Sequence, residues 1–141
     1  MEAAHDEGRV RQLGISNCYR PEVFEQLWAA ARVKPAVLQN RLYRDSGYDV
    51  ELRAVCRERG VAYQSFWTLT ANPHLHEGGP ITAAAAAHRR TPAQIFYRAL
   101  TQLGVVPLIG TTSEAHMRED LDIFSFTLDD GERDAIAAQL R

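Results

Sequence analysis

Residues 8–17, GRVRQLGISN, set the pattern from which the fold follows. The apolar run from Val10 to Ile15 favours a β-strand, and Ser16-Asn17 is typical of the turn that ends one. Pro21 follows closely, and proline suits the first turn of a helix because its missing N–H costs nothing there. The stretch therefore predicts a strand that leads directly into a helix.

The same order of strand and helix repeats along the chain. Further strands are expected at 36–40, 61–67 and 105–109, with helices between and after them at about 21–31, 49–59, 81–88, 91–103, 114–122 and from 129 onward. Asp49 is expected to cap the helix that Gly60 ends, and residues 68–80 have the composition of a long surface loop. Strands joined by helical crossovers predict an α/β chain with a parallel sheet.

Periodicity leaves two architectures open. Four strand–helix units can form an open four-stranded sheet, or they can form half of a (β/α)₈ barrel, which needs about 250 residues when whole. With 141 residues the chain is expected to be one domain, residues 1–141.

Composition excludes several classes of protein. The chain is 45% hydrophobic and 24% charged with a formal net charge of −2, as is usual for soluble globular domains. Lys34 is the only lysine, and acids offset the arginines, so no nucleic-acid partner is expected. Neither a membrane span nor a secretory signal is evident. Cys18 and Cys56 form no recognised metal or redox spacing, which indicates two reduced thiols in a cytoplasmic protein.

Four segments resemble one known family. Residues 8–17 resemble the G-x-V-R-x-I-G-V-S-N strand of the aldo-keto reductases, and residues 35–40, PAVLQN, resemble the next strand with its glutamine in place. Residues 91–95, TPAQI, match a helix start of that family, and residues 105–120, VVPLIGTTSEAHMRED, match its last strand, phosphate loop and following helix. Their order and spacing agree. The resemblance implies the C-terminal half of a TIM (β/α)₈ barrel, from parallel (β/α) units.

The resemblance places a nicotinamide cofactor at the strand ends. Ser16, Asn17 and Gln39 match the side chains that hydrogen-bond the carboxamide of the nicotinamide, and polar side chains can meet both its donors and its acceptors. Phe66 stands where the family has a tyrosine stacked on the nicotinamide ring, and a phenyl face can also stack.

A second group of residues follows the last strand. Backbone N–H groups at the start of a helix favour an anion, so the resemblance places the cofactor phosphates there. It assigns phosphate and adenine contacts to Gly110, Thr111, Thr112, His116, Glu119 and Asp120. Gly110 and His116 stand where the family often carries a lysine or arginine. The cofactor is therefore expected to be NADP or NAD, with little preference and with weak or absent binding in the isolated chain.

The catalytic residues of the family have no counterpart in this sequence. Its aspartate, tyrosine, lysine and histidine come from the first four strands, whereas Met1 to Glu7 match only the tail of a preceding helix. The resemblance implies an oxidoreductase that interconverts carbonyls and alcohols, here without the proton donor and inactive alone. A small carbonyl substrate is expected only if the barrel is completed. The alternative is a non-catalytic half-barrel that acts as a nucleotide-binding or interaction module.

Three further expectations concern assembly, metal and the tryptophans. An open half-barrel has two sheet edges, and Val37, Leu38 and Val106 are expected to be interior residues left exposed, so self-association is expected. His74, His76 and Glu77 lie close in sequence without a further ligand at a recognised spacing, so no metal site is expected. Trp28 and Trp67 are expected to be anchors in the core or an interface.

Overall fold

The four expected strands form one sheet in which every neighbouring pair is parallel. The computed structural model describes residues 1–76 and 78–141. The sheet follows chain order, with β1 at Gly14–Ser16, β2 at Val37–Arg41, β3 at Ala62–Phe66 and β4 at Val105–Pro107. The α/β class and the parallel sheet are therefore confirmed, although no strand has quite the bounds expected.

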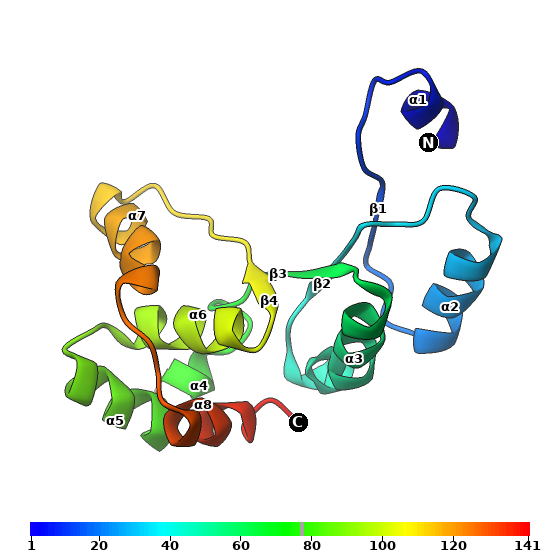
Figure 1. Ribbon diagram of the computed structural model, residues 1–141. Helices are drawn as coiled ribbons and strands as arrows, with labels where there is room; N and C mark the ends of the chain where they lie inside the picture. Colours follow the sequence, from blue (N-terminus) through cyan, green and yellow to red (C-terminus); the bar gives the residue numbers. More distant parts are fainter. Residues whose placement is uncertain (77) are drawn as a thin grey trace.

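Helices connect the strands and cover one side of the sheet. They are α1 (Glu2–Asp6), α2 (Pro21–Ala30), α3 (Val50–Arg59), α4 (Pro73–His76), α5 (Gly79–His88), α6 (Pro92–Gln102), α7 (Glu114–Leu121) and α8 (Asp130–Ala137), with 3₁₀ turns η1 (Arg44–Asp49) and η2 (Asp122–Ser125). Figure 1 shows α2 and α3 on the side of β1 and β2, and α5, α6 and α8 gathered on the side of β4. Capping boxes begin α6 at Thr91 and α8 at Asp129.

The two sides of the sheet differ in burial, because successive side chains of a strand point to opposite sides. Leu38, Asn40, Tyr63, Ser65 and Val105 are buried on the side that faces the helices. The other side, which we call the open face, consists of Gly14, Ser16, Val37, Gln39, Arg41, Ala62, Gln64, Phe66 and Val106, all half-buried or exposed.

The expected exposure of Leu38 is wrong. Leu38 is 0% exposed, in the same hydrophobic core as Phe24 and Phe96. Strand alternation explains the correction, because a side chain between Val37 and Gln39 must point away from the open face. Val37 is half-buried and Val106 is 46% exposed, so these two do lie on the open face.

Two local expectations also need correction. Asp49 precedes α3, but its side chain makes no capping hydrogen bond, because its carboxylate instead accepts hydrogen bonds from Asn40 and Tyr63 in the core. The expected loop at 68–80 contains α4 and the start of α5. Within it, the buried Asn72 side chain donates to the backbone oxygen of Leu42 at 2.7 Å, so this segment is packed against the sheet rather than lying loose over it.

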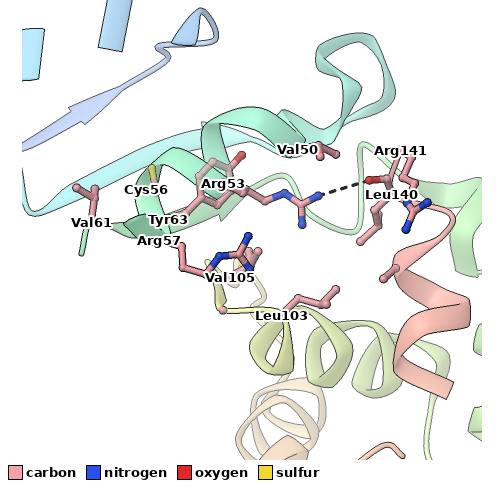
Figure 2. A pocket seen from close by; sticks show the side chains of 12 residues that line it. Val50, Arg53, Cys56, Arg57, Val61, Tyr63, Leu103, Val105, Leu140 and Arg141 are labelled. Carbon is pink, nitrogen blue, oxygen red and sulfur yellow. Dashed lines mark hydrogen bonds between the residues drawn. The ribbon is translucent and has the colours of Figure 1, made fainter. Parts of the chain in front are cut away.

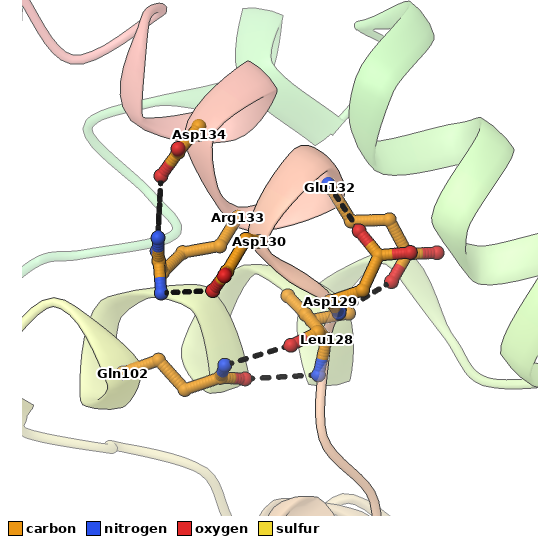
Figure 3. A network of polar contacts seen from close by, with 7 residues as sticks. All are labelled: Gln102, Leu128, Asp129, Asp130, Glu132, Arg133 and Asp134. Atoms are coloured by element: carbon orange, nitrogen blue, oxygen red, sulfur yellow. Dashed lines mark hydrogen bonds and ion pairs between the residues drawn. The ribbon is translucent and has the colours of Figure 1, made fainter.

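A polar network fixes α8 against α6. Figure 3 shows the side-chain amide of Gln102, at the end of α6, forming hydrogen bonds of 2.9 and 3.0 Å with the backbone oxygen and nitrogen of Leu128. Asp129 and Glu132 then complete the capping box of α8, and Arg133 pairs with acidic residues of the same helix. The Gln102 contacts hold the start of the C-terminal helix against α6, and α8 packs on both α5 and α6.

Candidate active site at the C-terminal edge of the sheet

Strand register brings two of the expected nicotinamide contacts together on the open face. Ser16 pairs with Gln39, Gln39 with Gln64, and Gln64 with Val106, so one row of residues crosses all four strands. The Gln39 amide donates to the Gln64 side-chain oxygen at 3.0 Å. The row presents a hydroxyl and two amides to the open face, which can donate to and accept from an amide-bearing ring.

A buried asparagine positions Asn17 beside this row. The Asn17 backbone N–H donates to the Gln39 carbonyl, and its side-chain amide donates to the Ser16 hydroxyl at 3.2 Å. Asn40 is 0% exposed, and its side chain forms hydrogen bonds with both the backbone nitrogen and the backbone oxygen of Cys18. Asn17 has a φ of 58°, and this left-handed turn is tolerated by asparagine. Ser16, Asn17 and Gln39 therefore form one cluster.

Phe66 lies at the end of β3, where it pairs in register with Arg41. It is half-buried on the open face, in keeping with a stacking position. Trp67 follows it with a φ of 54° and is 59% exposed, so it is no core anchor; its ring lies 4.3 Å from the Arg41 guanidinium. Sequence reasoning missed Arg41, which brings a positive charge to the same edge, held between the rings of Trp67 and Tyr43.

Five of the six residues assigned to phosphates and adenine line one pocket of about 400 Å³. They are Gly110, Thr111, His116, Glu119 and Asp120; Thr112 is exposed and does not line it. Leu69 and Tyr97 also line it, and together with Gly110 they line a second pocket of about 520 Å³ that reaches Trp67. The two pockets therefore adjoin each other at the C-terminal edge of the sheet, and we call them together the groove. None of the strand-end cluster residues lines either pocket.

Some backbone N–H groups of the loop before α7 and of its first turn already form hydrogen bonds within this segment. The Ser113 backbone N–H donates to the Thr111 hydroxyl at 3.1 Å, and the Ser113 hydroxyl accepts from the His116 N–H at 3.4 Å. Ser113 thereby begins α7 as an N-cap. Gly110 and Thr111, which precede this cap, are the residues of the loop that line the pocket.

Burial affects the acid–base chemistry of this pocket. Desolvation raises the pKa of the Asp120 carboxyl from its ordinary value, while His116 opposes the shift and Glu119 adds to it. Burial also raises the pKa of Tyr97 to about 12, with a smaller contribution from Asp120. In both cases burial shifts the equilibrium toward the protonated group, because it penalises the charged form.

Arginines lie next to the pocket on the side of α7. A neighbouring pocket of about 610 Å³ shares Thr91 and Glu119 with it and is also lined by Arg89, Arg90 and Arg118. Arg90 forms an ion pair with Asp122, and Arg118 forms one with Glu114. Two of the three guanidinium groups are therefore already paired with a carboxylate.

The described residues, 1–76 and 78–141, hold neither a cluster of metal ligands nor a membrane-spanning helix. In these ranges no three His, Cys, Asp or Glu side chains are grouped to hold a metal ion. His74 contacts the Tyr48 hydroxyl at 3.0 Å, and Glu77 lies outside the described residues. No helix in the same ranges is long and apolar enough to cross a bilayer.

Comparison with known proteins points to one family. The model of the aldo/keto reductase family matches residues 1–141. The chain is 32% identical to a probable NAD(P)H-dependent D-xylose reductase of Emericella nidulans, covering 97% of this chain and 46% of that protein. It is 29% identical to the glyoxal reductase of Bacillus subtilis, covering 98% of this chain and 49% of that protein.

Solved structures agree on the architecture. An aldo/keto reductase from Brucella melitensis superposes with a TM-score of 0.85 at 28% identity, over 99% of this chain and 52% of that one. An aldose reductase from Schistosoma japonicum gives 0.82 at 26% identity, over 99% of this chain and 44% of that one. This chain spans about half the length of the relatives it matches. The four strands therefore correspond to half of a barrel rather than to an open sheet.

Proposed function

Since this chain belongs to the aldo/keto reductase family, we propose that it supplies the cofactor-binding half of a carbonyl-reducing active site. The cofactor is a nicotinamide nucleotide, NADP or NAD. When bound, that cofactor supplies a hydride for the interconversion of a carbonyl and an alcohol. The residues of this chain bind and orient it.

The observation that carries this proposal is the position of the candidate residues on one edge of the sheet. The Ser16–Asn17–Gln39 cluster and the groove that contains Gly110 and Asp120 both lie at the carboxyl ends of parallel strands. Active sites of (β/α)₈ enzymes are found at this edge. The donor set fits the ligand, since one cluster offers amides and a hydroxyl and the groove offers a helix start and a partly buried acid.

We place the proton donor of the reaction in the other half of the barrel. Lys34, the only lysine, donates to the Trp28 carbonyl oxygen at 2.6 Å at the end of α2. The pKa values of Tyr63 and Tyr97 are raised by burial, which makes both poorer acids at neutral pH. We therefore expect the isolated chain to bind cofactor weakly and to reduce no carbonyl. A small carbonyl substrate binds only when the other half of a barrel is present.

The open face supports self-association. Val106, Leu108 and Ile109 are each between 37% and 46% exposed, and β1 and β4 are the edges of the sheet. A large apolar side chain left in water forfeits about 1.5–3 kcal/mol of burial free energy, against a total stability of about 5–15 kcal/mol. A second copy pairing half with half covers both edges and this face. Sedimentation at micromolar concentration tests this, and a single sharp monomer boundary would contradict it.

A steady-state assay with generic aldehydes and NADPH tests the catalytic part of the proposal. The purified chain is expected to show no turnover. Turnover that persists after stringent purification and disappears in Asn17→Ala would overturn the absence of catalysis. If no turnover is seen and no cofactor binds, the chain is an interaction module and not a cofactor-binding half. Binding is therefore measured on the same preparation.

A further inference from the structure

A separate cavity lies at the opposite, N-terminal edge of the sheet. Its volume is about 290 Å³, near the lower end of the roughly 300–1,000 Å³ range of small-molecule sites. Val61 precedes β3 and Val105 begins β4, so both mark the edge at which the strands start. Figure 2 shows this cavity between α3 and the C-terminal segment that follows α8.

Most of the cavity wall is apolar. The apolar lining residues are Val50, Cys56, Val61, Leu103, Val105, Ala137 and Leu140. The ring of Tyr63 also lines the cavity. Its hydroxyl donates to Asp49 at 2.8 Å, so we count the ring as part of the apolar wall. Among the described residues no carboxylate side chain lines the cavity, that of Asp49 included. The cavity therefore accommodates an apolar body.

The polar part of the lining consists of guanidinium groups. Arg53 and Arg57 are one helical turn apart on α3, and Arg141 also lines the cavity. Arg53 is half-buried; its Nη2 makes a long hydrogen bond of 3.4 Å to the Leu140 carbonyl, and its buried Nε has no hydrogen-bond partner among the described residues. Burial lowers the pKa of the Arg53 guanidinium, although arginine stays protonated at neutral pH.

Among residues 1–76 and 78–141, Arg53, Arg57 and Arg141 form no ion pair, although the buried Asp49 carboxylate acts on Arg53 from a longer distance. Ion pairs of the described residues instead use Arg9, Arg20, Arg32, Arg59, Arg90, Arg118 and Arg133. Two like charges one turn apart repel each other, and a half-buried guanidinium with unused donors is costly to leave unpaired. An anion held between Arg53 and Arg57 removes both costs.

We propose that this cavity is a binding site for a small organic anion, with an apolar body against Leu103 and Leu140 and a carboxylate or phosphate between Arg53 and Arg57. Guanidinium groups bind both kinds of anion through paired N–H donors. The site is distinct from the proposed cofactor groove, because the two lie at opposite edges of the parallel sheet.

Calorimetric titration of the whole chain with hexanoate, hexyl phosphate and hexan-1-ol tests the proposal. One or both anions are expected to bind at least about ten-fold more tightly than the alcohol, because charge-assisted hydrogen bonds are lost with the charge. Comparison of hexanoate with hexyl phosphate identifies which anion the site prefers. Equal binding of anions and alcohol, or no binding of either anion, overturns the proposal.

Variants locate the site. Arg53→Met keeps most of the side-chain volume and should weaken anion binding about ten-fold or more. Arg57→Met should also weaken anion binding. Because Arg57 is exposed, this variant is expected to fold even if Arg53→Met does not. Arg11→Met, at an exposed arginine outside the cavity, is the control and should bind as the parent chain does. Unchanged binding in Arg57→Met contradicts the assignment.

Discussion

The side-chain amide of Gln39 donates a 3.0 Å hydrogen bond to the side-chain oxygen of Gln64, its register partner on the next strand. Both lie on the open face, in the row that also contains Ser16. Gln64 thus fixes the orientation of the amide that we assign to the cofactor. The remaining oxygen of Gln39 and the remaining N–H groups of both amides are left to meet a ligand.

Gln64→Ala is expected to weaken NADH binding although Gln64 need not touch the cofactor. Loss of one neutral hydrogen bond of about 0.5–1.5 kcal/mol lets the Gln39 amide rotate, so affinity should fall about two- to ten-fold. Quenching of protein fluorescence by NADH measures this. Gln12→Ala, at an exposed glutamine before β1, is the control. Equal affinity of the Gln64 variant and the parent would show that the orientation of Gln39 does not matter for binding.

The two sides of the sheet should respond differently to truncation. Leu38→Ala removes a fully buried side chain and should lower the free energy of unfolding by about 2–5 kcal/mol. Val106→Ala, on the open face, should lower it by less than about 1 kcal/mol at a protein concentration too low for self-association. Urea unfolding of the two variants at one protein concentration measures both values. A cost for Val106→Ala as large as that for Leu38→Ala would mean that the open face is covered as thoroughly as the core.

Gln102 is expected to contribute to stability through the backbone of Leu128. Leu128 is only 2% exposed, and Gln102→Ala removes the side chain that binds its backbone N–H and carbonyl. The free energy of unfolding should therefore fall by about 1–3 kcal/mol. Gln26→Ala, at an exposed position of α2, is the matched control and should cost far less. Thermal unfolding compares them. Equal melting temperatures of the two variants would show that the contact in Figure 3 adds nothing.

The pKa of Tyr97 gives a pH dependence with a definite sign. Burial raises it from 10.0 to about 12, so between these pH values the unfolded chain ionises this phenol while the folded chain keeps its proton. Stability from this group is complete below pH 10 and is lost as pH rises toward 12. Between pH 9 and 11.5 the free energy of unfolding should therefore fall less for Tyr97→Phe than for the parent chain. Parallel curves in urea unfolding across that range would contradict the assignment.

The fold could be predicted from the sequence to the level of element order. Alternating apolar and amphipathic segments locate the strands and helices, but a short apolar run such as 36–40 does not reveal which side of the sheet each residue faces. Leu38 was therefore placed on the wrong side. Local rules predict a cap at Asp49 and a surface loop over 68–80. They cannot show that Tyr63 and Leu42, distant in sequence, bind the side chains of Asp49 and Asn72 in the interior.

Sequence motifs identified the candidate residues that lie in recognisable segments. They did not identify the residues that tertiary packing brings to the same edge. Ser16 and Gln39 lie in strands and Asn17 follows one, all within recognisable segments, and the structure brings the three together. Their contact with a cofactor stays a prediction. Tyr97 and Leu69 also line the groove, but they come from α6 and the segment before α4 and carry no motif. Asn40 binds the backbone of Cys18 at the turn after β1. This role can be recognised only once the burial of its side chain is known.

Mapping of bound NADH by amide chemical shifts tests the central claim most directly. In a titration of the ¹⁵N-labelled chain, we expect weak saturable binding, with the largest shifts at Ser16, Gln39 and the loop from Gly110 to Ser113. NADPH should produce the same pattern with similar affinity. Shifts centred on the N-terminal edge near Arg53, strong selectivity for NADPH, or no shifts at all would contradict the assignment of this chain as the cofactor-binding half.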